Sequence, residues 1–577
     1  MKKRLKRKPL EEAVMTRHSV VKGLFFGCML FSSINLHAAG RKAQELVKAG
    51  SWVYDAFASL SIESGLVDFT DQAPLSVQEL KLYLSEINYD QLSVAGKVQY
   101  KKLAAYFDDG RFSVGSDIVS ASVEPEVNVE GYYKSEDDID WVYDRYERRP
   151  ILYAPVTFSV ADYLSMGMDL YLGQNKGRMQ HDDNYTNVPY SPGHIDVNFP
   201  DTGYFSAGYM FTDLTGVNFQ LGMGSQSVGR SMTGSMIMSE YFTGASYANF
   251  EIFNPNIRYN MNVTQYNVDK YMYTHRFDVR FFKKLSVSVQ ESMLVYHPLE
   301  LRFLNPLTIY HGMSPWRDYG SEESNTCAYL AIKASYAVSN YIRIYGLYAQ
   351  DQYQTAYERY NWPDNTTPNA IGGQLGVEAY VPMGAGYVHG RFEGSYAQPY
   401  LYIKEDPNWS LVRTYSESIG DDDPFYEWVG SPLGPDTISA ELNLGYEVPG
   451  SWAVTGSYLF MAKGEMSGTN VFNSGLNWGG TDTTANFDYW AFPDSDRQGQ
   501  KEAKRRQRLT TPSGTAEYVN RVAVRGSISP LDYLSFVVQP AYVFIFNHNH
   551  EKNEFTQGIE FALAVNLKLS RMFSHKN

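Results

Sequence analysis

From about Gly115 onward, apolar and polar residues alternate with a period of two, the pattern of β-strands whose two faces meet different surroundings. In "THRFDVRF" (274–281), for example, Phe277, Val279 and Phe281 alternate with Arg276, Asp278 and Arg280. Strands of soluble sandwiches alternate in the same way, so the connections between strands must decide which kind of sheet this is.

Short turns and long polar connections follow one another along this region. Short turns are predicted near Val160–Tyr163, Leu214–Gly216, Asn254–Asn256, Lys283–Lys284, Ser339–Asn340, Pro382–Ala385, Val448–Ser451 and Ser529–Asp532. Long connections are predicted at Lys134–Arg149, Gln174–Thr202, Ser225–Glu240, Val295–Thr326, Gln352–Ala370, Gln398–Asp436 and Lys463–Gly514. Transmembrane β-barrels join their strands in this manner, with short turns at one end and long loops at the other. We therefore predict a transmembrane antiparallel β-barrel of about 18 strands over residues 113–577, with apolar faces toward lipid.

The turn at Val448–Ser451 has the residues of a type II turn, because Pro449 presets φ and Gly450 permits the positive φ that follows. At the C-terminal end, "GIEFALAVNLKLSRMF" predicts a long last strand. One of its faces carries Phe561, Leu563, Val565, Leu567, Leu569 and Phe573. It resembles the terminal strand by which outer-membrane barrels are recognised for assembly, although four residues follow Phe573. The barrel-assembly machinery is thus an expected partner.

Residues 40–112 have instead the spacing of amphipathic helices, and they predict a small helical domain. The first apolar stripe is formed by Trp52, Val53, Ala56, Phe57 and Leu60. A second helix is marked by a capping box, with Ser76 as N-cap and Glu79 three residues later, flanked by Leu75 and Leu80 as a hydrophobic staple. A third helix is predicted from Ser93, with Val94, Val98, Leu103 and Phe107 as its apolar residues.

Residues 1–39 have the layout of a secretory signal peptide. From Met15, a basic start precedes the apolar run "LFFGCMLFSSINL" and the small residues Ala38 and Ala39. The run is too short for a spanning helix, and the residues before Cys28 fit a lipoprotein signal poorly. Only Cys327 remains after cleavage, which excludes an internal disulfide. The expected location is the outer membrane of a diderm (Gram-negative-type) bacterium, with the helical domain in the periplasm.

The length, net charge and hydropathy of the chain argue against several classes of protein. A chain of 577 residues exceeds one ordinary soluble core of about 250–300 residues, whereas a barrel grows with its strand number. The formal net charge of −14 argues against a nucleic-acid partner, because phosphate binding needs a basic face. The mean hydropathy of −0.36 argues against a bundle of membrane helices.

Tryptophans gather in the predicted outer loops. Seven of the nine lie there: Trp141, Trp316, Trp362, Trp409, Trp428, Trp478 and Trp490. Many have acidic neighbours: Asp318 lies two residues after Trp316, and the aromatic Tyr319 follows it. Aromatic rings pack on the apolar faces of sugars while carboxylates accept from their hydroxyls, which makes these residues candidates for binding a glycan. The alternative is that they hold the loops together or form the interfacial belt.

Charged residues also fall on the predicted lumen face. They are Asp169, Arg276, Asp278, Arg280, Arg343, Glu378, Glu441, Arg521 and Arg525. In a water-filled lumen they would tune a channel, and in a plugged lumen they would pair with one another. Pairing is the default expectation.

Other chemistry is not indicated. Glu291 and Glu300 would suit a glycosidase only at a fixed separation, and no nucleophile–base pair accompanies them, so no enzyme is expected. His548 and His550 are too few for a structural metal site, and no cofactor or metal is predicted. The basic run Lys501–Arg508 either contacts an anionic glycolipid such as lipopolysaccharide or forms a solvated loop.

The stretch from His275 to Gly320 resembles the central region of Wzi-type capsule-assembly outer-membrane proteins. The resemblance rests on Glu291 after a strand, on "ELRFLNPL" (Glu300–Leu307), on the aromatic-rich link that follows, and on the helical segment "SWVYDAFASLSIESGLVDF". It implies an eighteen-stranded barrel with a helical bundle near its periplasmic mouth. It also implies outer loops that hold surface or capsular polysaccharide as a non-enzymatic lectin, and a monomer is expected.

The alternative is a diffusion porin for small solutes. The connection Val295–Thr326 discriminates between the two, because folding inward would place "LRFLNPLTIY" in the lumen and oppose a porin.

Overall fold

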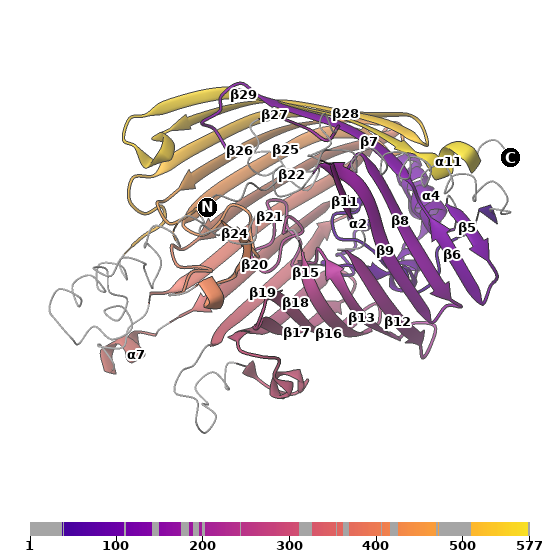
Figure 1. The fold of residues 1–577 in the computed structure, drawn as a ribbon, viewed down its shortest axis with the longest axis horizontal. Coiled ribbons are helices and arrows are strands. Elements are labelled where there is room, and N and C mark those ends of the chain that lie inside the picture. Colours follow the sequence, from indigo (N-terminus) through magenta and orange to yellow (C-terminus); the bar gives the residue numbers. More distant parts are fainter. Residues whose placement is uncertain are drawn as a thin grey trace, which may run out of the picture.

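The computed structural model of the chain describes residues 37–38, 40–108, 111–140, 149–174, 184–188, 195–198, 202–242, 244–310, 326–353, 355–361, 368–404, 407–415, 425–468, 471 and 509–574. It shows a tilted, closed antiparallel barrel preceded by a small helical domain (Figure 1).

The barrel has 18 strands, as predicted. The first strand is formed by β6 (Val119–Val123) and β7 (Glu126–Lys134), which are separated by Glu124 and Pro125. The others are β8 (Leu152–Val160), β9 (Leu164–Gln174), β12 (Gly203–Met210), β13 (Gly216–Gly224), β15 (Ala245–Phe253), β16 (Ile257–Asn267), β17 (Lys270–Phe281), β18 (Leu285–Tyr296), β19 (Thr326–Ser339), β20 (Ile342–Gln352), β21 (Ala370–Met383), β22 (Gly386–Ala397), β25 (Thr437–Val448), β26 (Trp452–Lys463), β27 (Glu517–Leu531), β28 (Leu534–Phe546) and β29 (Phe555–Lys568). Pairing of β29 with β7, from Glu560↔Lys134 to Lys568↔Glu126, closes the barrel, so the wall has no open edge.

All eight predicted short turns join neighbouring strands at one end of the barrel, here called the short-turn end, and the opposite end is called the loop end. The last turn lies slightly later than predicted, because β27 continues to Leu531. At the turn before β26, Gly450 has φ +76° and the Ser451 N–H donates to the Val448 carbonyl at 3.0 Å. The type II prediction is thus confirmed.

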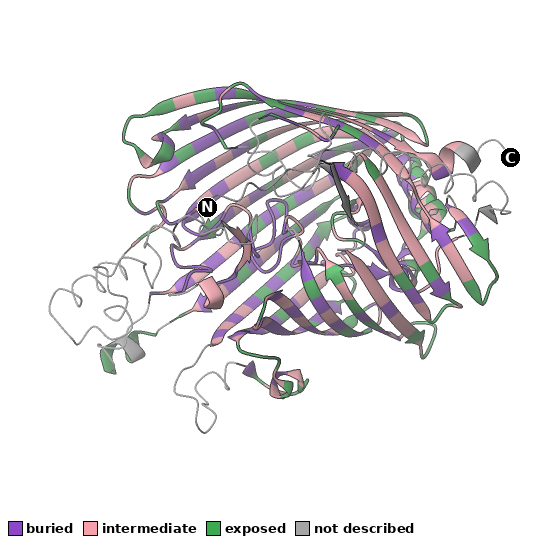
Figure 2. Ribbon diagram, in the orientation of Figure 1, coloured by how far each residue is buried: buried purple, intermediate pink, exposed green. Residues whose placement is uncertain are grey.

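Burial alternates along the strands as the sequence pattern requires (Figure 2). On β17, Arg276, Asp278 and Arg280 are buried inside, whereas Phe277 and Phe281 are exposed on the outer wall. Polar residues thus face the lumen and apolar residues face lipid, as expected of an outer-membrane barrel.

The prediction of one long C-terminal strand was wrong at its end. β29 stops at Lys568, and Leu569 and Phe573 lie in the short helix α11 (Leu569–Ser574). The partner strand is interrupted at Glu124 and Pro125, and proline has no N–H to offer a ladder. The Leu569 N–H donates to the Pro125 carbonyl at 2.9 Å, where the ladder ends.

The helical domain contains α2 (Trp52–Glu63), α3 (Val77–Ser85) and α4 (Val94–Asp108). The Ser76 hydroxyl accepts from the Glu79 N–H at 3.2 Å, which confirms the N-cap of α3. Leu75 and Leu80 are both buried, as the staple requires. The apolar stripe predicted for α4 holds only in part, because Leu103 is buried whereas Val94 is 65% exposed. Within the described ranges, no helix is long and apolar enough to cross a membrane.

Candidate functional site

The helical domain lies in the lumen at the short-turn end. The Val67 N–H donates to the Lys283 carbonyl at 3.0 Å in one short turn, and the Tyr341 N–H donates to the Ile62 carbonyl at 2.8 Å in another. The Tyr387 hydroxyl on β22, two strands beyond β20, bonds the carboxylate of Glu63. Lys48 pairs with Asp169 on β9, on the opposite side of the barrel. The domain therefore contacts strands on different sides of the wall and fills this end of the barrel.

In most ion pairs between the helical domain and the lumen wall, the domain supplies the acid and the barrel supplies the base. The pairs are Asp68–Arg343, Asp71–Arg276, Asp71–Lys333, Glu86–Arg280 and Glu86–Lys283. Lys48–Asp169 and Arg41–Glu124 run in the opposite direction. The domain thus neutralises a lumen wall that is rich in Arg and Lys.

Asp71 is the most connected of these acids. Its carboxylate pairs with Arg276, which is 1% exposed, and with Lys333 at 3.0 Å. Burial alone would raise the pKa of Asp71, but the nearby Arg276 and Lys333 outweigh burial and lower its pKa to about 2. Asp71 is therefore ionised at any physiological pH, and each charge in this triad has a partner.

Glu79 on α3 has a different environment. It lies 3.2 Å from Arg258 on β16, and Arg258 also pairs with Glu251 on β15. Burial raises the pKa of Glu79 to about 8, and the neighbouring Glu251 adds to this effect although Arg258 opposes it. The carboxyl of Glu79 therefore holds a proton at neutral pH, so its contact with Arg258 is not a full ion pair. In the capping box, Glu79 was expected to bond the backbone of Ser76, but it turns to Tyr83 and Arg258 instead.

The predicted lumen charges all lie inside the barrel wall. Within the wall, Arg276 Nε donates to Asp278 at 2.8 Å, Arg343 Nε to Glu378 at 3.0 Å, Arg521 Nε to Glu560 at 2.8 Å and Arg525 to Gln539 at 3.0 Å. Pairing among wall residues is thus confirmed, but the sequence alone missed the helical domain as partner of Asp169, Arg276, Arg280 and Arg343. Four acids of the domain contact basic residues of the wall and were the available signal: Asp68, Asp71, Glu79 and Glu86. Their wall partners lie more than 160 residues away in the chain.

Residues 225–242, predicted as an outer loop, also fold into the lumen. Their short strand β14 (Ser227–Val228) pairs with β3 (Gln72–Ala73) of the helical domain, so the two form one unit. The N–H groups of Met232 and Thr233 donate to the Glu393 carboxylate on β22 at 2.9 and 3.0 Å. Arg230 of this segment pairs with Asp55 of α2. The middle of the lumen is therefore bridged from the helical domain to the wall.

A polar cavity of about 210 Å³ remains where the domain, residues 225–242 and the wall meet. Its lining includes Asp55 and Asp68 from the domain, Arg230 from the segment, and Arg391 and Glu441 from the wall. Glu441, predicted to face the lumen, contributes here.

An apolar core closes the loop end. It contains inward-facing wall residues such as Met272, Leu294 and Leu347, which pack against Met236 of the inward segment and against residues 400–403. The hydroxyls of Tyr329 and Tyr402 both donate to the Met236 carbonyl, at 2.7 and 2.9 Å. These inward apolar positions in the sequence could have indicated the loop-end core, because a water-filled lumen would carry polar residues there.

Trp428 belongs to this core and is not a free ring at the surface. It lies in β24 (Phe425–Trp428), which pairs with β23 (Val412–Tyr415), and it is only 7% exposed. Its ring centroid is 5.9 Å from that of Tyr402. The burial of Trp428 agrees with the alternative interpretation, that the ring holds the loops together.

Trp409 is half-buried in η5 (Pro407–Trp409) at the loop end, in a position that suits the prediction better. The other candidates, Trp316, Asp318, Tyr319, Trp478 and Trp490, lie outside the described residues, as do Trp141, Trp362 and the basic run 501–508. His548 and His550 bind loop groups: His548 lies 3.4 Å from Glu517, and His550 Nδ1 lies 2.8 Å from the Thr515 carbonyl oxygen. Among the described residues no cluster of three His, Cys, Asp or Glu is placed to hold a metal ion.

The described part of the connection Val295–Thr326 does not fold inward. Residues 297–310, with η4 (Leu301–Leu304), lie on the outer wall beside β17 and β18 (Figure 1). This segment therefore does not obstruct the lumen; the helical domain, residues 225–242 and the loop-end core do so instead.

Comparisons with known proteins agree on the fold. No protein-family model and no curated protein matches the chain. Among solved structures, Wzi of Escherichia coli, an outer-membrane protein involved in group 1 capsule assembly and described as a carbohydrate-binding β-barrel, is 11% identical. The match covers 90% of this chain and 99% of Wzi with a TM-score of 0.54.

Two further matches are more distant. OprD of Pseudomonas aeruginosa is 10% identical over 78% of this chain and 95% of its own, with a TM-score of 0.37. OmpT of Vibrio cholerae is 7% identical over 79% and 99%, with a TM-score of 0.29. At 11% identity the likeness to Wzi shows the fold alone, and the chain has the fold of an outer-membrane β-barrel.

Proposed function

We propose that this outer-membrane barrel binds or tethers surface polysaccharide through its extracellular loops and does so without catalysis. The observation that carries the proposal is the filled lumen. The helical domain, residues 225–242 and the apolar core at the loop end occupy it at three levels. A barrel built in this way offers its loops, not its lumen, to partners outside the cell.

The packing of the loop end supports the proposal. Lys404 pairs with Asp351 at 2.7 Å beneath the loops, and Lys270 donates to the Pro407 carbonyl at 2.7 Å, next to Trp409. These buried contacts hold η5 and β23 on a rigid base, and a preorganised base reduces the entropy lost when a ligand binds. In this arrangement the helical domain faces the periplasm. The likeness in fold to a carbohydrate-binding barrel agrees with the proposal.

Binding to a panel of capsular and lipopolysaccharide glycans tests the proposal. The double variant W316A/W409A is expected to lose binding, because each ring that stacks on a sugar and contributes about 1.4 kcal/mol changes the affinity about tenfold. W452A is the matched control, since Trp452 is 41% exposed at the opposite end of the barrel. Binding that is unchanged in W316A/W409A, or absent in the wild type for every glycan, contradicts the proposal.

Single-channel conductance separates the proposal from a diffusion porin. The refolded, heat-modifiable wild-type barrel is expected to be silent in a planar bilayer, because the domain and the loop-end core close the lumen in series. A large and steady conductance would favour the porin and would move the function from the loops to the lumen.

A further inference from the structure

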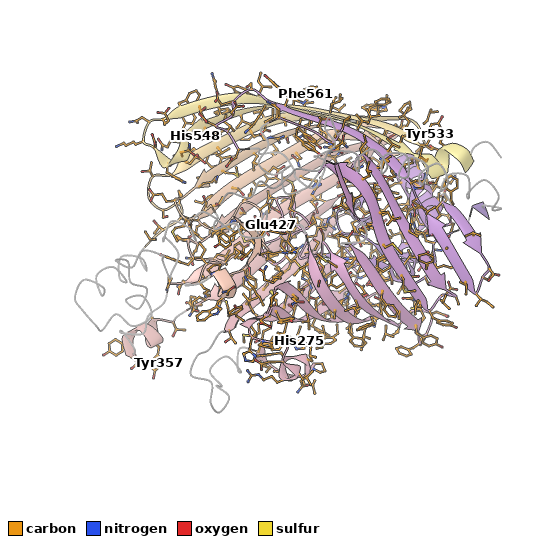
Figure 3. All side chains as sticks on the ribbon, in the orientation of Figure 1. His275, Tyr357, Glu427, Tyr533, His548 and Phe561 are labelled. Atoms are coloured by element: carbon orange, nitrogen blue, oxygen red, sulfur yellow. The ribbon has the colours of Figure 1, made fainter. Side chains whose placement is uncertain are left out.

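Residues 297–310 cover polar groups on a part of the outer wall that should face lipid. His275 on β17 and Glu291 on β18 are directly paired across the two strands, and both point outward. His275 lies near the middle of its strand, and Figure 3 shows it on the outer side of the wall beside this segment. An ionisable group at that depth is costly when it faces hydrocarbon. The segment removes this cost by lying over both residues.

The wall in turn satisfies the backbone of the segment. The Glu300 N–H donates to the Tyr273 hydroxyl at 2.9 Å, and the Tyr310 N–H donates to the Glu291 carboxylate at 2.9 Å. The Tyr259 hydroxyl lies 3.3 Å from the Pro306 carbonyl oxygen, to which it donates. Irregular backbone is tolerated at membrane depth only where such partners replace water. The outward tyrosines and Glu291 provide these partners.

The two faces of the segment differ in the way that this location requires. Phe303 and Tyr310 point to the wall and are 2% and 0% exposed. The side chains that point away include three strongly exposed apolar ones, Leu301 at 76%, Leu307 at 88% and Ile309 at 71%. The polar His297 and Asn305 are exposed as well. The three apolar side chains continue the lipid-facing surface of the strands beneath, where Phe277 is 48% and Val289 is 45% exposed. In water, three such neighbouring side chains would form an unfavourable apolar patch.

We propose that residues 297–310 form a membrane-embedded strap whose partner is the acyl chains of the lipid leaflet at the loop end. The segment is then not an aqueous outer loop. Its apolar side chains contact lipid, its backbone bonds the outer wall, and it shields the His275–Glu291 pair from hydrocarbon. This inference is independent of glycan binding, because it concerns the outer wall and not the loops above the barrel.

Spin-label accessibility tests the strap. In a C28S/C327S background, a nitroxide on L307C in liposomes is expected to collide with oxygen and to lose collisions with a water-soluble nickel chelate. V289C is the control for a lipid-facing wall position, and K552C, in the exposed turn before β29, is the control for water. Accessibility at L307C equal to that at V289C supports the strap. Accessibility equal to that at K552C overturns it, because the segment would then stand in water.

A second variant tests what holds the strap down. Y259F/Y273F removes two hydroxyls that bond its backbone and is expected to shift the label at L307C toward the behaviour of K552C. The matched control is Y336F, which changes an outward tyrosine on β19 far from the strap. Heat modifiability verifies that every variant forms a barrel. If Y259F/Y273F leaves the label as deep as in the parent, the role assigned to these two bonds is wrong.

Discussion

Replacing Asp71 by Asn is expected to release the helical domain from its fixed place in the lumen. The substitution keeps the size of the side chain but leaves Arg276 and Lys333, both nearly fully buried, without their shared carboxylate. Removing one partner of a buried ion pair costs about 3–5 kcal/mol, because an uncompensated charge stays behind. Asp278 still bonds Arg276, so the barrel itself is expected to form.

Two measurements on D71N, protease sensitivity and conductance, test what release of the helical domain does. Protease added on the side of the domain is expected to cut D71N in residues 40–108 faster than the wild type. The conductance of D71N is expected to stay as silent as that of the wild type, because the loop-end core still closes the lumen.

The control is D90N, since Asp90 is exposed at the start of η1 (Tyr89–Gln91). D90N is expected to behave as the wild type does. If D71N is as protease-resistant as D90N, the ion pairs do not hold the domain.

Docking of the helical domain is also expected to weaken as the pH rises. Burial raises the pKa of Glu79 from its ordinary value of 4.5 to about 8 in the docked state. Between these two values the docked carboxyl holds a proton that the released domain gives up, so docking is strongest near pH 5 and weakens toward pH 8. Each pH unit in this window removes up to about 1.4 kcal/mol, and above pH 8 the effect levels off.

E79Q tests the origin of this dependence. Glutamine has no proton to lose, so protease protection of E79Q is expected to be flat from pH 5 to pH 8, whereas protection of the wild type declines. E86Q is the matched control, because Glu86 is at the end of the same helix and at the edge of the interface, paired with Lys283. E86Q should retain the decline. A decline of equal slope in E79Q would mean that another group carries the pH dependence.

Low pH does not reverse this trend within the physiological range. Asp71 has its pKa lowered to about 2, so its ion pairs persist throughout and are lost only in strong acid. The two acids of the domain therefore act in separate pH ranges. Asp71 stabilises docking at every physiological pH, and Glu79 determines how docking weakens above pH 5.

The barrel could be predicted from the sequence because the features that determine it, the strand period and the turn residues, act over a few residues. A period of two is imposed by the pleat at each strand, and a Pro-Gly pair fixes a turn within four residues, as at Val448–Ser451. The N-cap at Ser76 is equally local and was predicted correctly. Two local predictions were wrong because contacts with distant segments changed the local outcome. The strand at Leu569 ended because its partner was interrupted at Pro125, and Glu79 turned from its own helix end to Arg258.

The candidate site was predictable only in part. The alternation predicts that Arg276 and Arg343 point inward. Their partners Asp71 and Asp68 lie in another domain, and no sequence pattern in either segment predicts that the two segments come together. Trp428 shows the same limit: an aromatic residue beside acids suits a sugar, but its neighbour Tyr402 comes from the preceding part of the loop and buries it. Residues 297–310 were placed among the outer loops because sequence distance between strands does not tell on which side of the wall a long connection folds.

The amino-acid sequence by itself therefore determined that this protein is an 18-stranded barrel with a helical domain before it, because period, turn chemistry and caps act over a few residues. Only the tertiary structure decided that the domain and residues 225–242 fill the lumen and that residues 297–310 cover the outer wall. These outcomes depend on which buried charge meets which partner and on which apolar surface remains uncovered, and both are settled only when segments far apart in the chain come together.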